Sequence, residues 1–223
     1  MKTVLITGAN RGIGLALTRH YLDRGDRVIA ACRHASAELQ ATGAQVEAGV
    51  DVTDGAALAA LAERLEGVAI DVLLLNAGVL ERDAFGHIDE DGFEAMRRQF
   101  EVNTLGPLRV AQALRDRLAE GAKIAIVTSR MGSMADNTSG GSYGYRASKA
   151  AVNAIGKSLA VDLAPCGIAV LLLHPGYVAT DMVGGKGDVQ PGESAAGLVE
   201  RIDELGIDDS GSFRHAKGDP LPW

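Results

Sequence analysis

Short apolar stretches alternate along most of the chain with longer stretches in which apolar residues recur at helical spacing. The short stretches predict buried strands, and the longer ones predict amphipathic helices. Strands are predicted at residues 4–6, 27–31, 45–50, 72–75, 123–128 and 168–173. Helices are predicted at residues 12–24, 89–120, 143–164 and 193–205. A further helix is predicted to begin after Asp54, which would cap it, and to carry Leu58, Leu61 and Leu65.

This alternation favours a parallel sheet that helices cover on both faces. The strand at residues 72–75 is apolar at every position, which is typical of strands buried on both sides. Pro107 predicts a kink or a boundary within the longest helix. No shift in composition and no repeat of roughly 20–50 residues divides the chain, so we expect one domain over residues 1–223. The Gly-rich segment at about 177–192 and the polar tail would belong to it.

Composition and charge narrow the function classes. Apolar residues make up 47% of the 223 residues and charged residues 23%, close to the average of soluble globular proteins. The net charge of −7, from 22 Lys and Arg against 29 Asp and Glu, argues against nucleic-acid binding. No apolar run approaches the ~20 residues of a membrane helix. Cys32 and Cys166 lie far apart, which predicts neither a disulfide framework nor a zinc site and suits the reducing cytoplasm.

A glycine-rich turn follows the first predicted strand directly. It reads Thr7-Gly8-Ala9-Asn10-Arg11-Gly12-Ile13-Gly14, and a helix begins within it. Glycine lets the backbone approach a bulky ligand, and the helix N-terminus offers free N–H groups to a phosphate. A connection without any ligand would also use glycine, but the place after the first strand favours a dinucleotide site.

The second strand indicates which dinucleotide binds. An acidic residue at its end usually holds the ribose 2′-hydroxyl of NAD(H), and here the chain reads Ile29-Ala30-Ala31-Cys32-Arg33 without an acid. Arg33 and Arg11 could instead flank a 2′-phosphate through paired hydrogen bonds. Both arginines could also be ordinary surface charges, yet the missing acid and the two cations together favour NADP(H).

Tyr145 and Lys149 are four residues apart on a predicted helix and therefore lie one turn apart on one face. An unperturbed phenol has a pKa of about 10, and a nearby ammonium lowers it toward neutrality. The pair could thus donate and accept a proton. A surface tyrosine packed along a lysine stem would give the same spacing, so the surrounding residues decide between the two interpretations.

Polar residues follow several predicted strands, where parallel sheets bind ligands. Ser129 ends the fifth strand and could hydrogen-bond a carbonyl oxygen beside Tyr145. Asn76 follows the fourth strand in an Asn-Ala-Gly turn and could serve as a ligand contact, a turn residue or both. Asn103 lies inside a helix, where asparagine is mildly unfavourable, which points to a structural or catalytic use. Asp51 could bind an adenine amino group or cap the next helix.

Taken in order, these motifs resemble those of the short-chain dehydrogenases/reductases over nearly the whole chain. They are Thr7-Gly8-x-x-x-Gly12-Ile13-Gly14, Asp51-Val52, Asn76-Ala77-Gly78, Asn103, Ser129, Tyr145-x-x-x-Lys149 and Pro175-Gly176 with Thr180. Residues 128–137, 143–149 and 218–223 are more closely similar to the sniffer-like carbonyl reductases and the bacterial C-factor proteins. The resemblance implies an α/β protein with a single-domain Rossmann fold, a doubly wound parallel sheet of about seven strands with helices on both faces.

The resemblance also implies a role for each matched position. Tyr145 would donate a proton to the carbonyl oxygen, and Lys149 would lower the pKa of Tyr145 and hold the nicotinamide ribose. Ser129 would orient the carbonyl, and Asn103 would hold a water that relays protons to Lys149. NADP(H) would contact Gly8, Asn10, Arg11, Gly12, Ile13, Gly14, Arg33, Asp51, Val52, Asn76, Ala77, Gly78, Asn103, Tyr145, Lys149, Pro175, Gly176, Val178 and Thr180.

Two positions depart from the family pattern. Leu75 stands where many members have the first asparagine of an Asn-Asn-Ala-Gly turn. Ser129 lies sixteen residues before Tyr145, a longer spacing than in many members, which a short insertion around residues 136–141 would explain. Ser133 is the rival hydroxyl, and the position at the end of a strand favours Ser129.

The sequence defines the substrate side less closely. Met131, Tyr143, Tyr177 and Met182 are candidate substrate contacts, although each could equally pack in the core. The glycine-rich loop at 181–189 could close over a substrate. The expected substrate is a small carbonyl compound, a ketone or an aldehyde.

Three functions compete for this sequence. An NADP(H)-dependent carbonyl reductase uses the whole set of Tyr145, Lys149, Ser129 and Asn103. A cofactor-binding sensing or signalling protein needs no acid or base, but the C-factor resemblance points to signalling. A sugar-nucleotide epimerase or dehydratase needs a larger substrate region than the roughly 40 residues that follow Thr180. The family resemblance further implies a homodimer or homotetramer that pairs through the helices at about 90–120 and 143–164.

Overall fold

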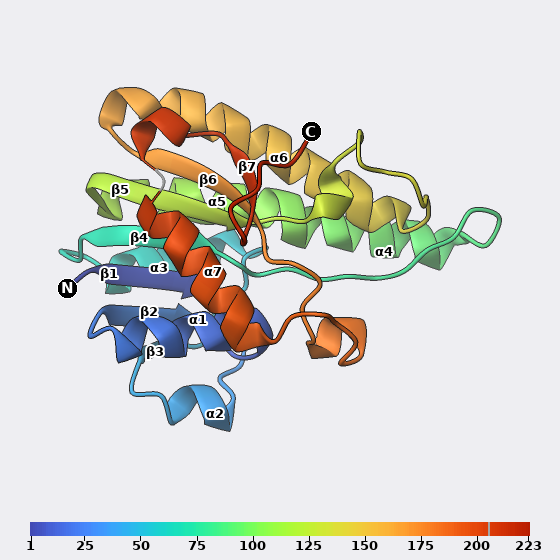
Figure 1. Ribbon diagram of the computed structural model, residues 1–223. Helices are drawn as coiled ribbons and strands as arrows, with labels where there is room; N and C mark the ends of the chain where they lie inside the picture. The colour runs from blue at the N-terminus through green and yellow to red at the C-terminus, as the bar shows by residue number, and fades with distance from the viewer. Residues whose placement is uncertain (205) are drawn as a thin grey trace.

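Seven parallel strands form one sheet in the computed structural model, which describes residues 1–204 and 206–223 (Figure 1). The strands are β1 (Thr3–Thr7), β2 (Arg27–Ala31), β3 (Gln45–Glu47), β4 (Ile70–Leu75), β5 (Leu118–Val127), β6 (Ala169–His174) and β7 (Phe213–His215). Their order is β3-β2-β1-β4-β5-β6-β7, and every neighbouring pair is parallel. This order is that of a Rossmann fold, so the predicted fold class is confirmed.

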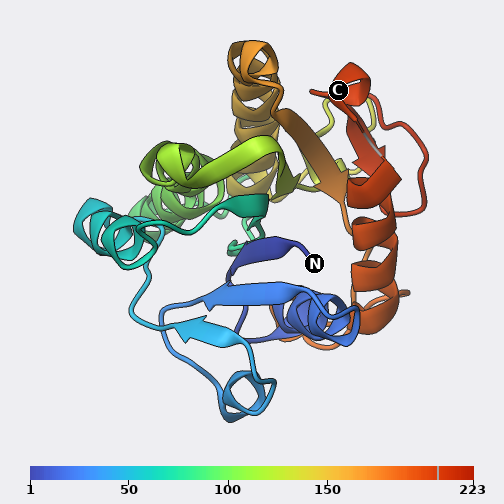
Figure 2. The same ribbon diagram turned by 90° about the vertical axis from the view of Figure 1, so that its left-hand side faces the viewer.

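Helices pack against both faces of the sheet (Figure 2). They are α1 (Gly12–Asp23), α2 (Ala37–Gln40), α3 (Gly55–Arg64), α4 (Glu90–Phe100), α5 (Gly106–Ala113), α6 (Tyr143–Leu163) and α7 (Pro191–Glu204). On one face α1 and α7 enclose a core that includes Leu17 and Leu198. On the other face α3, α5 and α6 pack around Leu61, Val110 and Val152. The sheet is therefore buried on both sides, as its continuous apolar strands require.

Most predicted elements are observed. Asp54 caps α3 by accepting hydrogen bonds from the backbone N–H groups of the first turn. Pro107 lies at the start of α5, and a π turn (Glu101–Leu105) separates α5 from α4. The prediction of one helix over residues 89–120 is wrong at its C-terminal end, because Leu118–Ala122 belong to β5. Leu118 pairs there with Ile70 of β4 across a register shift.

The sequence pattern does not predict two of the short elements. These are α2, a single helical turn, and β7, a three-residue strand in the segment predicted to be a polar tail. The third strand ends at Glu47, three residues before its predicted end. Leu205, the last residue of the helix predicted at 193–205, lies outside the described residues.

The strand order reverses at the centre of the sheet. From β1 the chain builds outward to β2 and β3, and it then crosses to β4 on the other side of β1. Helix α1, which follows β1, and helix α5, which follows β4, therefore lie on opposite faces of the sheet, and such a reversal leaves a crevice at the carboxyl ends of the strands. Ligands of doubly wound sheets bind in this crevice, so it is the place to look for the site.

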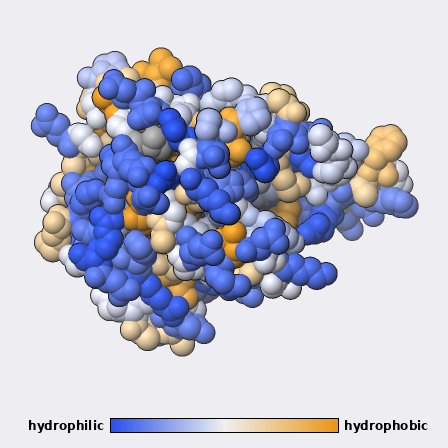
Figure 3. Space-filling model, in the orientation of Figure 1, coloured by the Kyte–Doolittle hydropathy of each residue, from blue (hydrophilic) through white to orange (hydrophobic). Residues whose placement is uncertain are grey.

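One connection projects from the body of the protein. It joins β4 to α4 and extends to the right in Figure 1. Phe85 in this connection is 85% exposed, and the same end of the molecule in Figure 3 carries hydrophobic atoms on a mostly hydrophilic face. In the described part of the chain, no helix has the length and apolarity to span a membrane.

Candidate active site

The glycine-rich turn after β1 packs against the turn after β4 at the crevice. Gly8 has a φ of +66°, and a Cβ there would lie 2.9 Å from the Cα of Ala77. A Cβ on Gly14 would overlap the carbonyl oxygen of Gly8 and lie 2.7 Å from Asn76 Nδ2. Glycine is therefore needed at both positions for the two turns to approach each other.

Thr7 and Asn76 tie the same two turns together. The Thr7 hydroxyl accepts hydrogen bonds from the backbone N–H groups of Asn76 (3.1 Å) and Ala77 (3.2 Å). In return the Asn76 amide donates to the carbonyl oxygens of Thr7 (3.1 Å) and Gly8 (3.2 Å). Asn76 thus fixes the shape of the glycine turn, which is the turn role that its sequence context allows.

Helix α1 begins at the glycine turn with an open N-terminus. Its N-cap residue Arg11 is extended, and the Arg11 side chain makes no capping hydrogen bond. The backbone N–H groups of Gly12, Ile13 and Gly14 therefore keep the donor capacity and partial positive charge that attract phosphate. An open helix end directly after β1 fits the pyrophosphate of a dinucleotide.

The ends of β2 and β3 supply a cation and a carboxylate. Arg33 is exposed after β2. Burial would raise the pKa of Asp51, after β3, but two hydrogen bonds from Thr53 and the charge of nearby Arg33 lower it overall. Arg11 lies elsewhere, with its guanidinium 3.6 Å from the Asp181 carboxylate. A 2′-phosphate at the end of β2 would therefore meet Arg33, while Arg11 faces the loop after β6.

Two predicted cofactor contacts also have structural partners. The carbonyl oxygen of Asn10 accepts a 2.7 Å hydrogen bond from Ser36, whose hydroxyl also caps α2. Val52 is buried, and its side chain would lie 2.9 Å from a Cβ on Gly106 of α5. These contacts hold the glycine turn and the segment after β3 in place around the crevice.

Tyr145 and Lys149 lie one turn apart on α6, as predicted. The Lys149 ammonium donates to the carbonyl oxygen of Val127 (3.0 Å) at the end of β5, and it lies 5.8 Å from the centre of the Tyr145 ring. Ser129 lies close enough to the Tyr145 phenol to lower its pKa. A phenol, an aliphatic hydroxyl and an ammonium thus converge at the carboxyl end of β5.

Burial dominates the titration of both α6 groups. It raises the pKa of Tyr145 to about 12, although the neighbouring Ser129 side chain acts in the opposite direction. Burial also lowers the pKa of Lys149 to about 8. The phenol pKa therefore rises in this structure rather than falling toward neutrality, because desolvation of the phenolate outweighs the effect of Ser129.

Asn103 lies in the π turn between α4 and α5. Its amide nitrogen donates to the carbonyl oxygen of Val79 (2.9 Å) and to Ser148 Oγ (3.1 Å), and its amide oxygen accepts from Val79 N (2.8 Å). A Cβ on Gly78 would lie 3.2 Å from this oxygen and 3.7 Å from Lys149 Nζ. Gly78 therefore leaves open the space between the two groups, and π turns of this kind are frequent at functional sites.

The two candidate serines have different surroundings. Ser129 lies beside the Tyr145 phenol. Ser133 is 2% exposed, donates to the backbone oxygen of Trp223 (3.2 Å) and accepts from Asp136 N (3.1 Å). The structure therefore brings Ser129, and not Ser133, to the tyrosine. Residues 134–140 are exposed, so the extra residues between Ser129 and Tyr145 form a surface loop.

The start of α6 is fixed by a residue that the sequence analysis does not single out. The Asp83 carboxylate, from the projecting β4–α4 connection, accepts hydrogen bonds from the backbone N–H groups of Tyr143 and Gly144. Its backbone carbonyl accepts from Ser142 N (3.0 Å). Asp83 thus caps the helix that carries Tyr145. The sequence analysis also does not predict the positioning roles of Thr7 and Ser36. Of these, only the role of Ser36 could have been predicted, because it stands just before a helix-forming stretch.

The loop after β6 closes against the glycine turn. Val178 pairs with Val189 in a parallel bridge, and the backbone of Tyr177 accepts hydrogen bonds from Asp188 N and Val189 N. A Cβ on Gly12 would lie 3.2 Å from the Thr180 methyl group. Thr180 therefore lies directly beside the N-terminus of α1, and the loop forms one wall of the crevice.

The Pro175-Gly176 turn begins this loop. The carbonyl oxygen of Pro175 accepts a 2.8 Å hydrogen bond from Ser194 of α7, which anchors the turn. Gly176 has a φ of +92°. The turn is thus held at the carboxyl end of β6, next to the end of β5 where Ser129 follows.

The four candidate substrate residues are not core residues. Tyr143, Tyr177 and Met182 are exposed, and Met131 is half-buried. Met131 follows Ser129 by two residues, and Tyr143 precedes Tyr145 by two. Core packing therefore does not explain these side chains, and they are available to a substrate.

Comparison with known proteins shows what this chain is similar to. The sequence model described as short chain dehydrogenase matches residues 2–190. The 1-hydroxy-2-glutathionyl-2-methyl-3-butene dehydrogenase of Rhodococcus sp. (strain AD45) is 49% identical over 229 residues, covering 100% of both chains. The C-signal protein of Myxococcus xanthus is 45% identical over 157 residues, which are 69% of this chain and 93% of that protein.

Solved structures agree with these relatives. NADPH-bound carbonyl reductase from chicken fatty liver has a TM-score of 0.90 at 31% identity, with 100% of this chain and 99% of that chain covered. Carbonyl reductase Sniffer of D. melanogaster has a TM-score of 0.90 at 28% identity, with 100% of both chains covered. The predicted resemblance to Sniffer-like carbonyl reductases and C-factor proteins is therefore confirmed.

Proposed function

Because this chain belongs to the short chain dehydrogenase family of oxidoreductases, we propose that it is an NADP(H)-dependent carbonyl reductase for a small ketone or aldehyde. The observation that carries the proposal is the meeting of Ser129, which is close enough to lower the pKa of the Tyr145 phenol, with Tyr145 and with Lys149 one turn away on α6. These groups lie beside the crevice that the glycine turn lines. A carbonyl oxygen placed between the two hydroxyls would receive a hydrogen bond from each.

The residues of the crevice fit a dinucleotide phosphate. Gly8 and Gly14 let the glycine turn pack against the turn after β4, and the open end of α1 that begins there offers N–H groups to a pyrophosphate. Arg33 offers a guanidinium to a 2′-phosphate, and Asp51 offers an acceptor to an adenine amino group. Bound NADP(H) would supply the hydride, and the NADPH in the chicken carbonyl reductase supports this choice.

Tyr145 is the proton donor in this proposal. Its pKa of about 12 keeps the phenol protonated at neutral pH, which is the form that a general acid requires. Ser129 orients the carbonyl and stabilises the negative charge that develops on its oxygen. Lys149, with a pKa of about 8, is mostly protonated at neutral pH and can return a proton to Tyr145. We propose that Asn103 binds a water molecule that relays protons between Lys149 and solvent. The Asn103 amide oxygen and the Lys149 ammonium both lie next to Gly78.

The relatives extend the range of substrates to test. The Rhodococcus protein is named as a dehydrogenase of an alcohol that carries a glutathionyl group. Alcohol oxidation is carbonyl reduction in reverse, with the Tyr145 phenolate as the base. A glutathione-conjugated aldehyde therefore belongs in the substrate panel beside simple aldehydes and ketones.

A signalling protein that binds the cofactor with little turnover is the second candidate. The observation in its favour is the 45% identity to C-signal. Such a protein would use the crevice and would have no need for an acid beside it. The buried contact between Tyr145 and Ser129 therefore favours the enzyme.

We also infer a homodimer or homotetramer that pairs through α4, α5 and α6. Phe93, Phe100 and Val161 are exposed apolar residues on α4 and α6, and a second copy would cover them. Light scattering on the purified protein tests this assembly. The free thiols Cys32 and Cys166 support a reducing, cytoplasmic setting.

The decisive experiment follows the oxidation of NADPH and of NADH in the presence of aldehydes, ketones, quinones and a glutathione-conjugated aldehyde. Tyr145→Phe is expected to lower turnover with NADPH by ~10³-fold and to retain NADPH binding. Tyr21→Phe is the matched control, because it removes a phenol hydroxyl on α1 that has no hydrogen-bond partner among the described residues.

Each other outcome has a defined meaning. Tight NADPH binding without turnover of any substrate would favour the signalling candidate. A preference for NADH would contradict the role of Arg33. Equal turnover by the wild-type protein and Tyr145→Phe would remove Tyr145 as the acid.

A further inference from the structure

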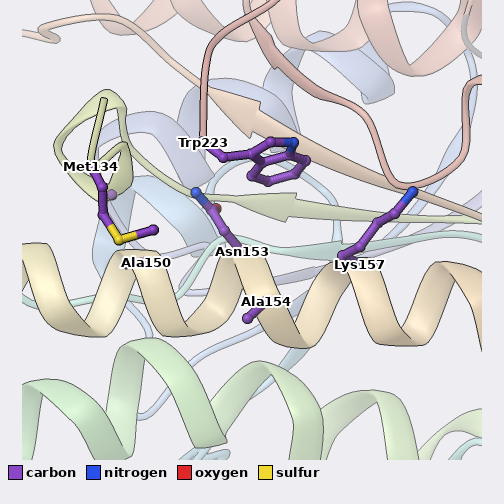
Figure 4. Close-up of a pocket in the computed structure, with 7 residues that line it drawn as sticks. Met134, Ala150, Asn153, Ala154, Lys157 and Trp223 are labelled. Atoms are coloured by element: carbon purple, nitrogen blue, oxygen red, sulfur yellow. The ribbon is translucent and has the colours of Figure 1, made fainter. Parts of the chain in front are cut away.

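A cavity of about 310 Å³ lies between α6 and the C-terminal segment (Figure 4). Its lining residues are Gly132, Met134, Ala150, Asn153, Ala154, Lys157 and Trp223. Asn153 lies about two helical turns beyond Tyr145 on α6, a separation of ~12 Å along the helix axis. The cavity is therefore distinct from the crevice of the proposed function, and its volume lies in the range of small-molecule sites.

The walls of this cavity suit a flat apolar group. The indole of Trp223 lies over α6 in Figure 4, stacks on Phe213 with 5.5 Å between the ring centres, and is 46% exposed. Ala150 and Ala154 of α6 also line the cavity, and Met134 closes one side. An indole in a cavity lined by small side chains accommodates an aromatic ring.

Two polar side chains define what such a ring would carry. Asn153 is 3% exposed, its amide oxygen accepts from Thr128 Oγ1 (2.6 Å), and its amide nitrogen has no hydrogen-bond partner in the described residues. Figure 4 shows this side chain rising from α6 beside the indole. Lys157 rises one turn further along, with its chain over Gly211, and among the described residues no Asp or Glu side chain lines the cavity.

We propose that this cavity is a second ligand site, specific for a small aromatic carboxylate. The ring would lie between Trp223 and α6, and the carboxylate would pair with the Lys157 ammonium. An oxygen on the ring would accept a hydrogen bond from the Asn153 amide nitrogen, a buried donor that the protein leaves without a partner. 4-Hydroxyphenylacetate carries these three features and serves as the probe.

The same ligand would act on the segment that carries Ser129. Gly132 and Met134 belong to that segment and line the cavity. The backbone oxygen of Trp223 accepts hydrogen bonds from Ser133 Oγ (3.2 Å) and Ala135 N (3.0 Å), which joins the segment to the indole residue. A ligand packed on Trp223 would hold these bonds closed and slow the local opening of residues 131–135.

The binding test uses the fluorescence of Trp223, the one tryptophan in the sequence, in the whole protein. 4-Hydroxyphenylacetate is expected to change the emission saturably, and uncharged 4-hydroxyphenylacetamide is expected to bind ~10-fold more weakly. Lys157→Met should weaken binding of the acid by ~10-fold. Lys217→Met is the matched control, because Lys217 is an exposed lysine outside the cavity, and it should leave the affinity unchanged.

Amide hydrogen exchange gives a second readout that needs no enzyme activity. A saturating concentration of the acid should slow exchange at Gly132 and Ala135 several-fold, and the same concentration of the amide should slow it less. A non-saturating emission change, equal affinities for acid and amide, or equal effects of Lys157→Met and Lys217→Met would overturn the site. Saturable binding of the acid without slower exchange would overturn its action on the Ser129 segment.

Discussion

Alanine substitution of Ser129 and of Ser133, one at a time, should separate the proposed chemistry from its structural support. The two residues lie four positions apart in one segment, and both are nearly buried, at 8% and 2% exposed. Ser129 lies beside the Tyr145 phenol and accepts one hydrogen bond from Met131 N (3.1 Å), whereas Ser133 bonds to Trp223 and Asp136. The same substitution therefore removes a proposed reacting contact and one structural bond at Ser129, and two structural bonds alone at Ser133.

The magnitudes differ for the same reason. Ser129→Ala removes one of the two hydroxyls proposed at the carbonyl oxygen, and loss of one such donor lowers kcat by ~10²–10³-fold. Ser133→Ala leaves Asp136 N without its partner and takes one of two donors from the Trp223 oxygen. Because Asp136 is exposed, water can replace its lost partner, and the cost is that of an ordinary hydrogen bond, about 0.5–1.5 kcal/mol. That loss corresponds to ~1–6 °C in Tm for a chain of this length.

Two measurements on each variant test this reasoning. Turnover of NADPH with the best carbonyl substrate should collapse in Ser129→Ala and stay within about threefold of wild type in Ser133→Ala. Thermal unfolding should show the larger decrease in Tm for Ser133→Ala. A collapse of kcat in Ser133→Ala, with Ser129→Ala retaining activity, would refute the assignment of the two serines.

Three further predictions test the crevice. Gly14→Ala forces a Cβ against the backbone, so it should weaken NADPH binding by at least ~10-fold and lower the free energy of unfolding by about 1–3 kcal/mol. At Gly55 a Cβ meets nothing within 4 Å, so Gly55→Ala should change neither quantity. NADPH titration and urea unfolding measure the two effects. Arg33→Ala should raise the Kd for NADPH by ~10–100-fold and leave that for NADH unchanged, and equal losses for both cofactors would contradict a 2′-phosphate contact. The pKa of Lys149 is about 8, and kcat/KM for NADPH reports the protonation state of the free enzyme. This ratio should therefore fall as the pH rises through about 8. A profile that stays flat to higher pH would exclude a role for the Lys149 ammonium.

The elements that the sequence predicts well carry a strong local signal. The run Val72–Leu75 is apolar throughout and becomes the C-terminal part of β4. Leu118–Glu120 has the composition of a helix, but these residues begin β5, where Leu118 pairs with Ile70 of β4 ahead of a register shift, and this tertiary pairing outweighs local propensity. In β7 only Phe213 is buried, so a three-residue strand beside β6 leaves no alternation to read.

In the candidate site, too, the parts that have a local sequence signal are predicted and the parts that depend on tertiary contacts are not. The glycine turn, Tyr145 and Lys149 each follow from short motifs, and the structure brings them together. The contacts that fix them join residues distant in sequence, such as Asp83 with the start of α6, 60 residues away, and Thr7 with Asn76. No local pattern contains such pairs. The effect of burial on the Tyr145 pKa likewise depends on the packed structure and not on the Tyr-Lys spacing.

The hydrogen bond between Ser133 and Trp223 joins residues 90 positions apart, which has a consequence for synthesis of the chain. A ribosome adds about 5–20 residues per second, so roughly 5–20 s pass between the two residues. The pairings among strands β1 to β5 and the bonds between Thr7 and Asn76 involve no residue beyond Val127, although α6 and α7 later cover the two faces of the sheet. The nucleotide side of the crevice can thus form on the ribosome well before the segment that carries Ser129 is secured. A nascent chain stalled before residue 213 should keep the first and lack the second.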